Sequence, residues 1–347
     1  MTLRHSLASN RSRMPIGRRG FLGTSTAMIV AAAQSSVSTQ LLADDQNAGK
    51  AKIAITFDLE MSRHYPQRGM MEWDYQKGNL DEATKQYSLK AARIAKALGG
   101  MIHFFCVGRV LEQSSVDWLK ELAGAGHSIG NHTYDHVNLL ADSPTNTQFR
   151  FQRSPWLVSG QTTSQVLREN IRLTNVALQE RVGIEANGFR TPGGFPNGLS
   201  DREDLQMMLL DLGFTWISSK YPRHIAGETG MPPTPEVYED IVRAQQDAQP
   251  FSYPTGLVEI PMSPISDVNA FRNQRWELKS FKKAVRLAVQ WAIDSGGVFD
   301  FLCHPSCMVV EDPDCQVVRL ICDLVKQAGE SAAIVDLGSI ARERMIR

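Results

Sequence analysis

Two histidines that lie four residues apart, His132 and His136, directly follow a short apolar segment that is predicted to be a β-strand. Imidazole is the commonest metal ligand in proteins, and an i, i+4 pair can place both rings on one face of a helical turn. The pair alone is equally typical of surface or helix-capping histidines. Two carboxylates, Asp58 and Glu60, stand at the end of another predicted strand, and His304 stands at the end of a third. Residues of ligand type at three strand ends indicate one shared site.

The types of these residues suit hydrolysis at a metal ion. In an extended chain residues i and i+2 share a face, so Asp58 and Glu60 can point into one pocket while Leu59 faces away. Two histidines and one carboxylate leave coordination positions open for water. The second carboxylate could accept a proton from that water, and a separate histidine could protonate the leaving group. We therefore predict a metal-dependent hydrolase of a carbonyl-type bond.

Strand and helix patterns alternate along most of the chain, which predicts the elements that hold these residues. The predicted strands are 53–57, 101–107, 128–131, 186–190, 214–218, 257–262, 298–303 and 333–336. The predicted helices are 80–98, 115–125, 165–181, 201–212, 279–294 and 314–328. Seven or eight βα units predict an α/β fold, an irregular (β/α)7-8 barrel with catalytic groups at the carboxyl ends of its strands. An open doubly wound sheet is the alternative, although no G-x-G-x-x-G sequence opens any helix.

The composition excludes one class of partner. Lys and Arg number 37, Asp and Glu also number 37, and the formal net charge is therefore zero. Because no basic face is implied, nucleic acid is not expected to be the main partner. Forty-two percent of the residues are hydrophobic, which is ordinary for a globular protein with a sizeable core. The oligomeric state does not follow from the sequence.

The amino-terminal region differs from the rest in charge. Residues 1–43 contain five arginines and no acidic residue. Arg18 and Arg19 precede a short apolar run, and the 13 residues from 21 to 33 are too few to span a bilayer as a stable anchor. This pattern resembles a signal peptide of the twin-arginine type, with a disordered basic tail as the alternative. We predict export to the periplasm or the extracellular space, a linker at 44–50 and one folded domain at 51–347.

Four short motifs, in order along the chain, resemble those of the polysaccharide deacetylases, the NodB-homology family or carbohydrate esterase family 4. Residues 56–58 are similar to the first three positions of the T-F-D-D motif, and residues 132–136 fit H-[ST]-x-x-H. Residues 190–194 fit R-x-P-x-G, and residues 302–304 fit L-x-H. The resemblance covers nearly the whole chain after the linker, and it implies a polysaccharide deacetylase-like catalytic domain.

The resemblance also implies a role for each matching residue. It implies that Asp58 is the general base, that His304 is the general acid and that Arg190 orients Asp58. It implies that His132 and His136 bind a metal ion, and that Leu302 lines the acyl pocket. Pro192 and Gly193, which follow Arg190 in the third motif, are expected to contact substrate.

The chain departs from the family pattern at several positions. Leu59 replaces the second aspartate of the first motif and cannot bind a metal ion. We infer that Glu60 is the carboxylate ligand, and the reverse assignment of Asp58 and Glu60 remains open. Gly193 stands where many relatives have an aromatic residue, and the segment 214–218 lacks the aspartate of the D-x-x-D-W motif. These changes resemble a divergent branch that includes peptidoglycan deacetylases and allantoinase-like enzymes.

These observations predict removal of N-acetyl groups from an amino-sugar polymer or oligosaccharide with one divalent metal ion. Zinc is the default ion, and cobalt, nickel or iron suit the same ligands. One alternative is a metal-dependent hydrolase of a linear or cyclic non-sugar amide. Another is a carbohydrate-binding protein with a degenerate site.

Several remaining residues have simpler interpretations. The five cysteines contain no C-x-x-C pair, so we expect structural roles, although a bridge or second metal site near Cys303 and Cys307 is conceivable. His64 follows the carboxylate pair and could reach the pocket rim. Trp73, Trp156 and Trp276 could stack on sugar rings, but each is more typical of a packing residue.

Overall fold

The computed structural model describes residues 49–69 and 77–346. The predicted signal peptide, most of the predicted linker and Trp73 lie outside the described residues. Among the described helices, none is long and apolar enough to cross a membrane.

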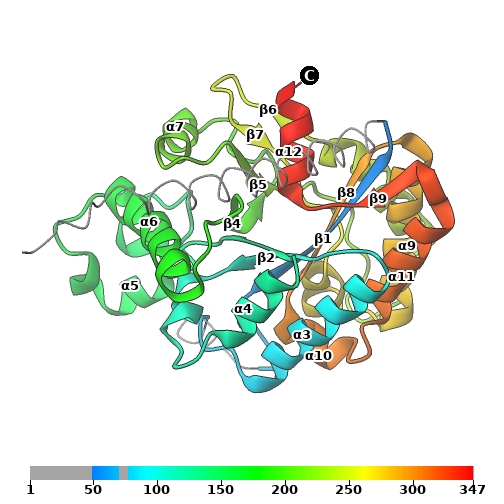
Figure 1. Ribbon diagram of the computed structural model, residues 1–347, viewed down its shortest axis with the longest axis horizontal. Helices are drawn as coiled ribbons and strands as arrows, with labels where there is room; N and C mark the ends of the chain where they lie inside the picture. Colours follow the sequence, from blue (N-terminus) through cyan, green and yellow to red (C-terminus); the bar gives the residue numbers. More distant parts are fainter. Residues whose placement is uncertain (1–48, 70–76, 347) are drawn as a thin grey trace, which may run out of the picture. The chain divides into compact units, whose positions relative to one another are not determined.

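One curled sheet of nine strands forms the centre of the described part of the chain (Figure 1). Its strands are β1 Ala51–Leu59, β2 His103–Cys106, β3 Ser128–Asn131, β4 Phe189–Phe195, β5 Trp216–Lys220, β6 Phe251–Ser252, β7 Val258–Glu259, β8 Val298–Cys303 and β9 Ala332–Ile334. Their spatial order is β6-β7-β5-β4-β3-β2-β1-β8, and β9 pairs with the first residues of β1. All of these pairs are parallel except β6–β7. The predicted irregular (β/α) barrel is confirmed.

Helices connect the strands and cover the sheet. They are α3 Glu82–Ala97, α4 Asp117–Gly124, α5 Phe149–Arg153, α6 Thr163–Val182, α7 Glu203–Asp211, α8 Pro235–Ala244, α9 Leu278–Ser295, α10 Pro305–Glu311, α11 Gln316–Ala328 and α12 Leu337–Ile346. A π-helical segment, η5 Val268–Asn273, precedes α9. In Figure 1, α9 and α11 pack side by side, with α9 against β1 and β8 and α11 against β9.

Strand β1, which pairs with β2, β8 and β9, is buried on both faces. All nine of its residues are buried, and the run Ile53 to Phe57 is apolar apart from Thr56. Parallel strands that are covered on both faces carry such continuous apolar runs. Helix α9 packs against β1 with one face of small and apolar side chains, at positions 281, 284, 285, 288, 289 and 292. That spacing is one face of an α-helix, and each large apolar side chain contributes about 1.5–3 kcal/mol when fully buried.

The last strands bring the two ends of the sheet together. After β7, the chain continues beside β5, because the amides of Ile260 and Met262 donate to backbone carbonyls of that strand. The amide of Ser263 then donates to the carbonyl of Asp300 on β8 (3.0 Å). The carboxyl ends of β1, β3, β4 and β8 consequently face one another around a common opening, where the predicted site residues follow them.

Two parts of the chain differ from the sequence prediction. The fourth strand was predicted at 186–190, but β4 begins at Phe189. Gly188 has a φ of 78°, and a Cβ there would lie within 2 Å of the Trp216 ring, so an extended strand cannot start before it. Between the predicted strands 214–218 and 257–262, where the sequence analysis predicts no helix, the chain forms a regular helix, α8, whose first turn has Pro235 after the N-cap Thr234.

Candidate active site

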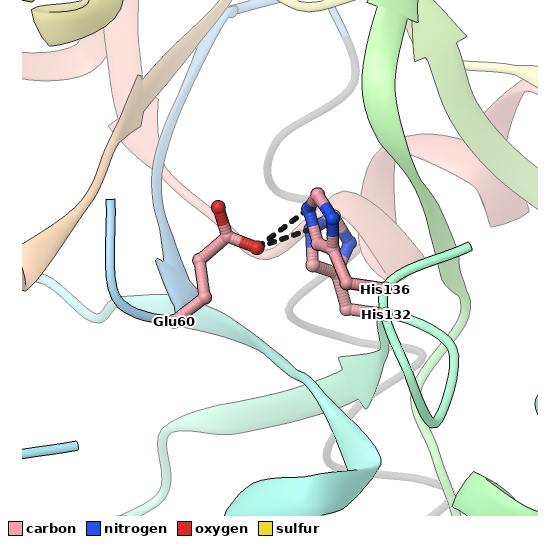
Figure 2. Close-up of side chains that lie close together, drawn as sticks. All are labelled: Glu60, His132 and His136. Carbon is pink, nitrogen blue, oxygen red and sulfur yellow. Dashed lines mark ion pairs between the residues drawn. The ribbon is translucent and has the colours of Figure 1, made fainter. Parts of the chain in front are cut away.

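Glu60, His132 and His136 bring three ligand atoms together at the carboxyl ends of β1 and β3 (Figure 2). The Nε2 atom of His136 lies 2.6 Å from Oε2 of Glu60, and the Nε2 atom of His132 lies 3.5 Å from the same oxygen. Among the described residues, these three form a group of His, Cys, Asp or Glu atoms close enough to hold one metal ion. Glu60 and His132 are buried, and His136 is partly exposed.

Two local backbone features aim these side chains. The amide of Glu60 donates to the carbonyl of Asp58 (3.0 Å), so the chain turns where β1 ends. Residues 132–136 form a loop and not a helical turn. Thr133 and His136 are left-handed, with φ of 58° and 59°, and the loop is closed by a hydrogen bond from the Val137 amide to Oγ1 of Thr133 (2.9 Å).

The protonation of the ligand atoms fits a bound cation. The Nδ1 atom of His132 lies 2.9 Å from the carbonyl oxygen of Arg190, and donation to that oxygen leaves the Nε2 lone pair toward the cluster. Burial lowers the pKa of His136 to about 4, so this ring is neutral at pH 7. Oε2 of Glu60 is buried, and apart from these two imidazoles it has no partner among the described residues. A buried carboxylate oxygen that faces two imidazole nitrogens is a donor set that a divalent ion satisfies.

Lys77 is a neighbour of this cluster that the sequence analysis missed. Its side chain is only 2% exposed, and its ammonium forms an ion pair with Oε1 of Glu60. The amide of Met61 donates to the Lys77 carbonyl (3.0 Å), which fixes the lysine beside the end of β1. Burial alone would raise the pKa of Glu60, but Lys77 and the imidazoles outweigh it and hold that pKa well below its usual value. One positive charge, that of Lys77, therefore already lies against the carboxylate of the three possible ligand residues.

Asp58 is held from the other side by Arg190, which is fully buried on β4. Nη1 of Arg190 donates to Oδ1 of Asp58 (3.2 Å), and Nη2 forms an ion pair with Asp300. Nε and Nη2 both donate to Oγ of Ser218 (3.3 and 3.2 Å), and the guanidinium lies over the Phe105 ring. This network leaves Asp58 little freedom to turn.

The two carboxylates thus have different surroundings. Oδ2 of Asp58 lies 3.7 Å from Nε2 of His132, whereas Oε2 of Glu60 lies closer to both imidazoles. Asp58 already accepts a hydrogen bond from Arg190, and Glu60 belongs to the group that could hold a metal ion. Glu60 therefore faces the two imidazoles, whereas Asp58 is held beside it by Arg190.

His304, directly after β8, faces the same cluster and is paired with an aspartate. Its Nε2 atom lies 3.5 Å from Oε1 of Glu60, and its Nδ1 atom lies 3.1 Å from both carboxylate oxygens of Asp267. The His304 amide also donates to Asp267 (2.9 Å). Burial alone would lower the pKa of His304, but fully buried Asp267 outweighs it and raises that pKa.

Asp267 was not predicted from the sequence. The segment 214–218 lacks the aspartate of the D-x-x-D-W motif, and the carboxylate beside His304 comes instead from Asp267, the N-cap residue of η5. No motif surrounds Asp267, so only its contact with His304 across the fold identifies it.

The cluster opens into a cavity of about 390 Å³. Its described lining includes Leu302 and Gly193, which were predicted to contact substrate, but not Pro192, which is buried in β4. The space around Gly193 is open, with no atom within 4 Å of the position of a Cβ. The remaining lining residues are Asp58, Glu60, Lys77, His132, His136, Thr191, Gly194, Tyr221, Met262, Ser266, Val268, Asn269, Arg272, Asn273 and His304.

The other residues considered in the sequence lie apart from the cluster or pack in the interior. All five cysteines are buried and unbridged, and Cys303 and Cys307 belong to the main core. Trp276 is also buried, whereas Trp156 is 71% exposed. His64 is half-buried in the loop after Glu60.

Comparisons with known proteins agree with this arrangement. Residues 45–209 match the family model described as polysaccharide deacetylase. Among solved structures, a Mycobacterium smegmatis protein assigned to the polysaccharide deacetylases aligns over 86% of this chain and 91% of its own, at 16% identity and a TM-score of 0.59. PuuE allantoinase aligns over 85% of this chain and 90% of its own, at 15% identity and a TM-score of 0.54. At these identities the two structures establish a shared fold. A search of curated proteins found no match.

Proposed function

The chain is a divergent member of the polysaccharide deacetylase family, and from this premise we propose that it is a metal-dependent hydrolase of N-acetyl groups on an amino-sugar polymer or oligosaccharide. The observation that carries the proposal is the convergence of Glu60, His132 and His136 with Asp58 and His304 in one cavity. A metal site, a proton acceptor and a proton donor are the groups that hydrolysis of an amide needs.

Glu60, His132 and His136 would hold the metal ion. Their one carboxylate and two imidazoles suit Zn²⁺ first, and Co²⁺, Ni²⁺ or Fe²⁺ next. When bound, the ion would supply Lewis-acid polarisation of the acyl carbonyl and of the attacking water.

The other roles belong to side chains of this chain. Asp58 would take a proton from the attacking water, and Arg190 would keep that carboxylate in place through the contact at 3.2 Å. His304 would donate a proton to the departing nitrogen, and Asp267 would favour the protonated imidazole. Leu302 would pack against the methyl group of the acetyl.

A second candidate is hydrolysis of a non-sugar amide at the same centre. The open space around Gly193 favours it, because no side chain fills the position where many relatives have an aromatic residue. The shared fold with an allantoinase is compatible with this alternative. Both candidates use the same residues and differ in the substrate alone.

We further propose that the chain is exported. The support is the Arg18-Arg19 pair and the short apolar run after it, which resemble a twin-arginine signal. Export would place a deacetylase of this kind where extracellular polysaccharides occur. Fusion of residues 1–43 to a reporter that folds before export would test the signal, with Arg18→Lys and Arg19→Lys as the control.

The test of the enzymatic proposal measures acetate and metal together. Metal-reconstituted protein is incubated with acetylated chitooligosaccharides and with peptidoglycan fragments, and released acetate is quantified. Asp58→Asn should keep the metal and lose about 10²–10⁴-fold in turnover. Glu60→Gln retains an acceptor for Lys77 and should weaken metal binding by at least about 100-fold, together with turnover.

The possible outcomes distinguish between the candidate functions and between the two assignments of the carboxylates. Loss of metal with Asp58→Asn and retention with Glu60→Gln would reverse the assignment of the two carboxylates. Bound metal without acetate release would shift the proposal to the non-sugar amide. Neither metal nor acetate would favour a carbohydrate-binding protein with a degenerate site.

A further inference from the structure

One wall of the active-site cavity is polar and basic, and it belongs to the π-helical segment η5. Val268, Asn269, Arg272 and Asn273 of this segment all line the cavity. π-helical turns are rare and are frequent at functional sites. None of these four side chains has a role in the proposed hydrolysis, so this wall is available for substrate recognition.

Arg272 is the charged group of this wall. It is half-buried, and within the described ranges 49–69 and 77–346 its side chain has no ion pair or hydrogen bond. Arg190, the other arginine near the centre, is satisfied by two carboxylates. A guanidinium presents a planar fork of N–H donors that matches a carboxylate in two parallel hydrogen bonds. A cavity-lining arginine without a protein partner therefore points to an anionic group on the ligand.

The positive charge at this wall extends beyond Arg272. The pKa of His64 is lowered, first by its partial burial and then by the guanidinium groups of Arg63, Arg272, Arg68 and Arg275. These four arginines come from two separate segments, the loop after β1 and the end of η5, and they act on one imidazole. In a chain of zero net charge, this concentration of one sign beside the active site would attract anions.

The position of the wall indicates which part of the substrate carries the anion. Asp267, the N-cap residue of η5, contacts His304. In the proposed reaction His304 protonates the departing nitrogen, so the segment that carries Arg272 starts at the partner of that proton donor. Arg272 thus belongs to the amine side of the scissile bond, and the acyl side faces Leu302.

We propose that the pocket selects an acylated amine whose amine portion carries a carboxylate, and that Arg272 binds this carboxylate. The inference rests on the proposed function in one respect, that the scissile bond is an amide whose nitrogen is protonated by His304. An amino sugar with an acidic substituent and an acylated amino acid both have this chemistry. Asn273 follows Arg272 on the same wall, and its side-chain amide, which donates one hydrogen bond to Oδ1 of Asn269 (3.4 Å), has a second N–H for the ligand.

The test compares each acid with its neutral methyl ester, so that size and amide are matched. The two probe pairs are N-acetylmuramic acid with its methyl ester and an N-acetylated amino acid with its methyl ester. Binding is measured in an Asp58→Asn background to prevent turnover, and kcat/KM is measured with Asp58 intact. Arg272→Gln removes the charge, Arg272→Lys retains it, and Arg275→Gln is the control at an exposed arginine that does not line the cavity.

We expect the intact pocket to prefer one acid over its ester by about 10–100-fold, the range of a hydrogen-bonded charge pair. Arg272→Gln should abolish that preference, Arg272→Lys should retain part of it, and Arg275→Gln should leave it within about threefold. The pair that shows the preference identifies the sugar or the amino acid. Equal binding of acid and ester in both pairs, or a preference that survives Arg272→Gln, would overturn the inference. A preference in binding without hydrolysis of any probe would count against the proposed function and leave the inference supported.

Discussion

The two buried carboxylates that contact Arg190, those of Asp58 and Asp300, allow a numerical prediction of how the free energy of unfolding depends on pH. Asp300 is fully buried on β8, where Oγ1 of Thr56 donates to it (2.7 Å) and Arg190 pairs with it. Arg190 also holds Asp58, so a single guanidinium serves two carboxylates. Burial raises the pKa of Asp300 from 3.8 to about 6 despite these partners.

The sign and size of the effect follow from linkage. Below pH 4 Asp300 is protonated in both the folded and the unfolded chain. As the pH rises from about 4 through about 6, the unfolded chain releases this proton at a lower pH than the folded chain does. The free energy of unfolding therefore decreases over this range. One pKa unit corresponds to about 1.4 kcal/mol, so the rise from 3.8 to about 6 amounts to about 3 kcal/mol between pH 4 and pH 7.5.

Asp300→Asn removes this titration and keeps an acceptor for Thr56 and Arg190. The free energy of unfolding is measured by urea denaturation at pH 4, 5, 6 and 7.5 for the original chain and for the variant. The difference, variant minus original, should increase by about 3 kcal/mol across this range. Exposed Asp323→Asn is the matched control, and its difference should stay constant. A change below about 0.5 kcal/mol with Asp300→Asn would refute the reasoning, because Asp300 would then titrate alike in both states.

Three further predictions concern the catalytic cluster. Lys77→Met removes the ammonium that pairs with Glu60, so the affinity for Zn²⁺, measured in competition with a chelator, should rise by about tenfold or more. An unchanged affinity would mean that Lys77 does not compete with the metal ion for Glu60. Asp267→Asn removes the carboxylate that raises the pKa of His304 against the effect of burial. We expect kcat to fall about 10–100-fold and the basic limb of the pH–rate profile to move to lower pH, with the metal content unchanged. A basic limb that does not move would show that Asp267 does not raise the pKa of His304. Removal of the metal ion with a chelator should abolish turnover and lower Tm, because the ion binds the folded chain alone, and Zn²⁺ or Co²⁺ should restore both. A chelator that changes neither turnover nor Tm would refute a metal requirement.

The fold was predictable because its strands are buried on both faces. Strands 128–131 and 298–303 begin and end where the apolar runs predict them. In a parallel sheet the apolar runs of the strands are separated by turns and helices. The alternation of strand and helix patterns along the sequence therefore predicts the barrel. The start of β4 could not be predicted, because it depends on the contact between Gly188 and the Trp216 ring, which come together only in the folded chain.

The site residues that could be predicted from the sequence are those at the ends of strands. Asp58, Glu60, His132 and His304 directly follow or end strands, and the topology of parallel strands brings such positions together. Lys77 lies in a loop 17 residues beyond its partner Glu60, and neither its type nor its spacing indicates that the two meet.

Asp300 is an intermediate case. It interrupts the apolar run of β8, and a carboxylate in the middle of a buried strand requires a partner. The sequence thus contained a signal that some cation meets β8, but the identity of that cation follows only from the position of Arg190 on β4.

The charges that line the cavity connect the metal site with the proposed substrate. The carboxylates of Asp58 and Glu60 are balanced by the cations of Lys77 and Arg272. Protonated His304 is balanced by Asp267, and Arg190 by Asp300, so the charges in and around the cavity sum to zero before any metal ion binds. A divalent ion would leave the cavity with a formal charge of +2. A carboxylate on the substrate and the negative charge that develops on the acyl oxygen would together neutralise it. Because Lys77 offsets Glu60, a neutral substrate would leave excess positive charge in a buried site, which is costly. The buried lysine and the unpaired arginine therefore favour the same class of substrate, an anionic one, and binding of that substrate should tighten when the metal ion is present.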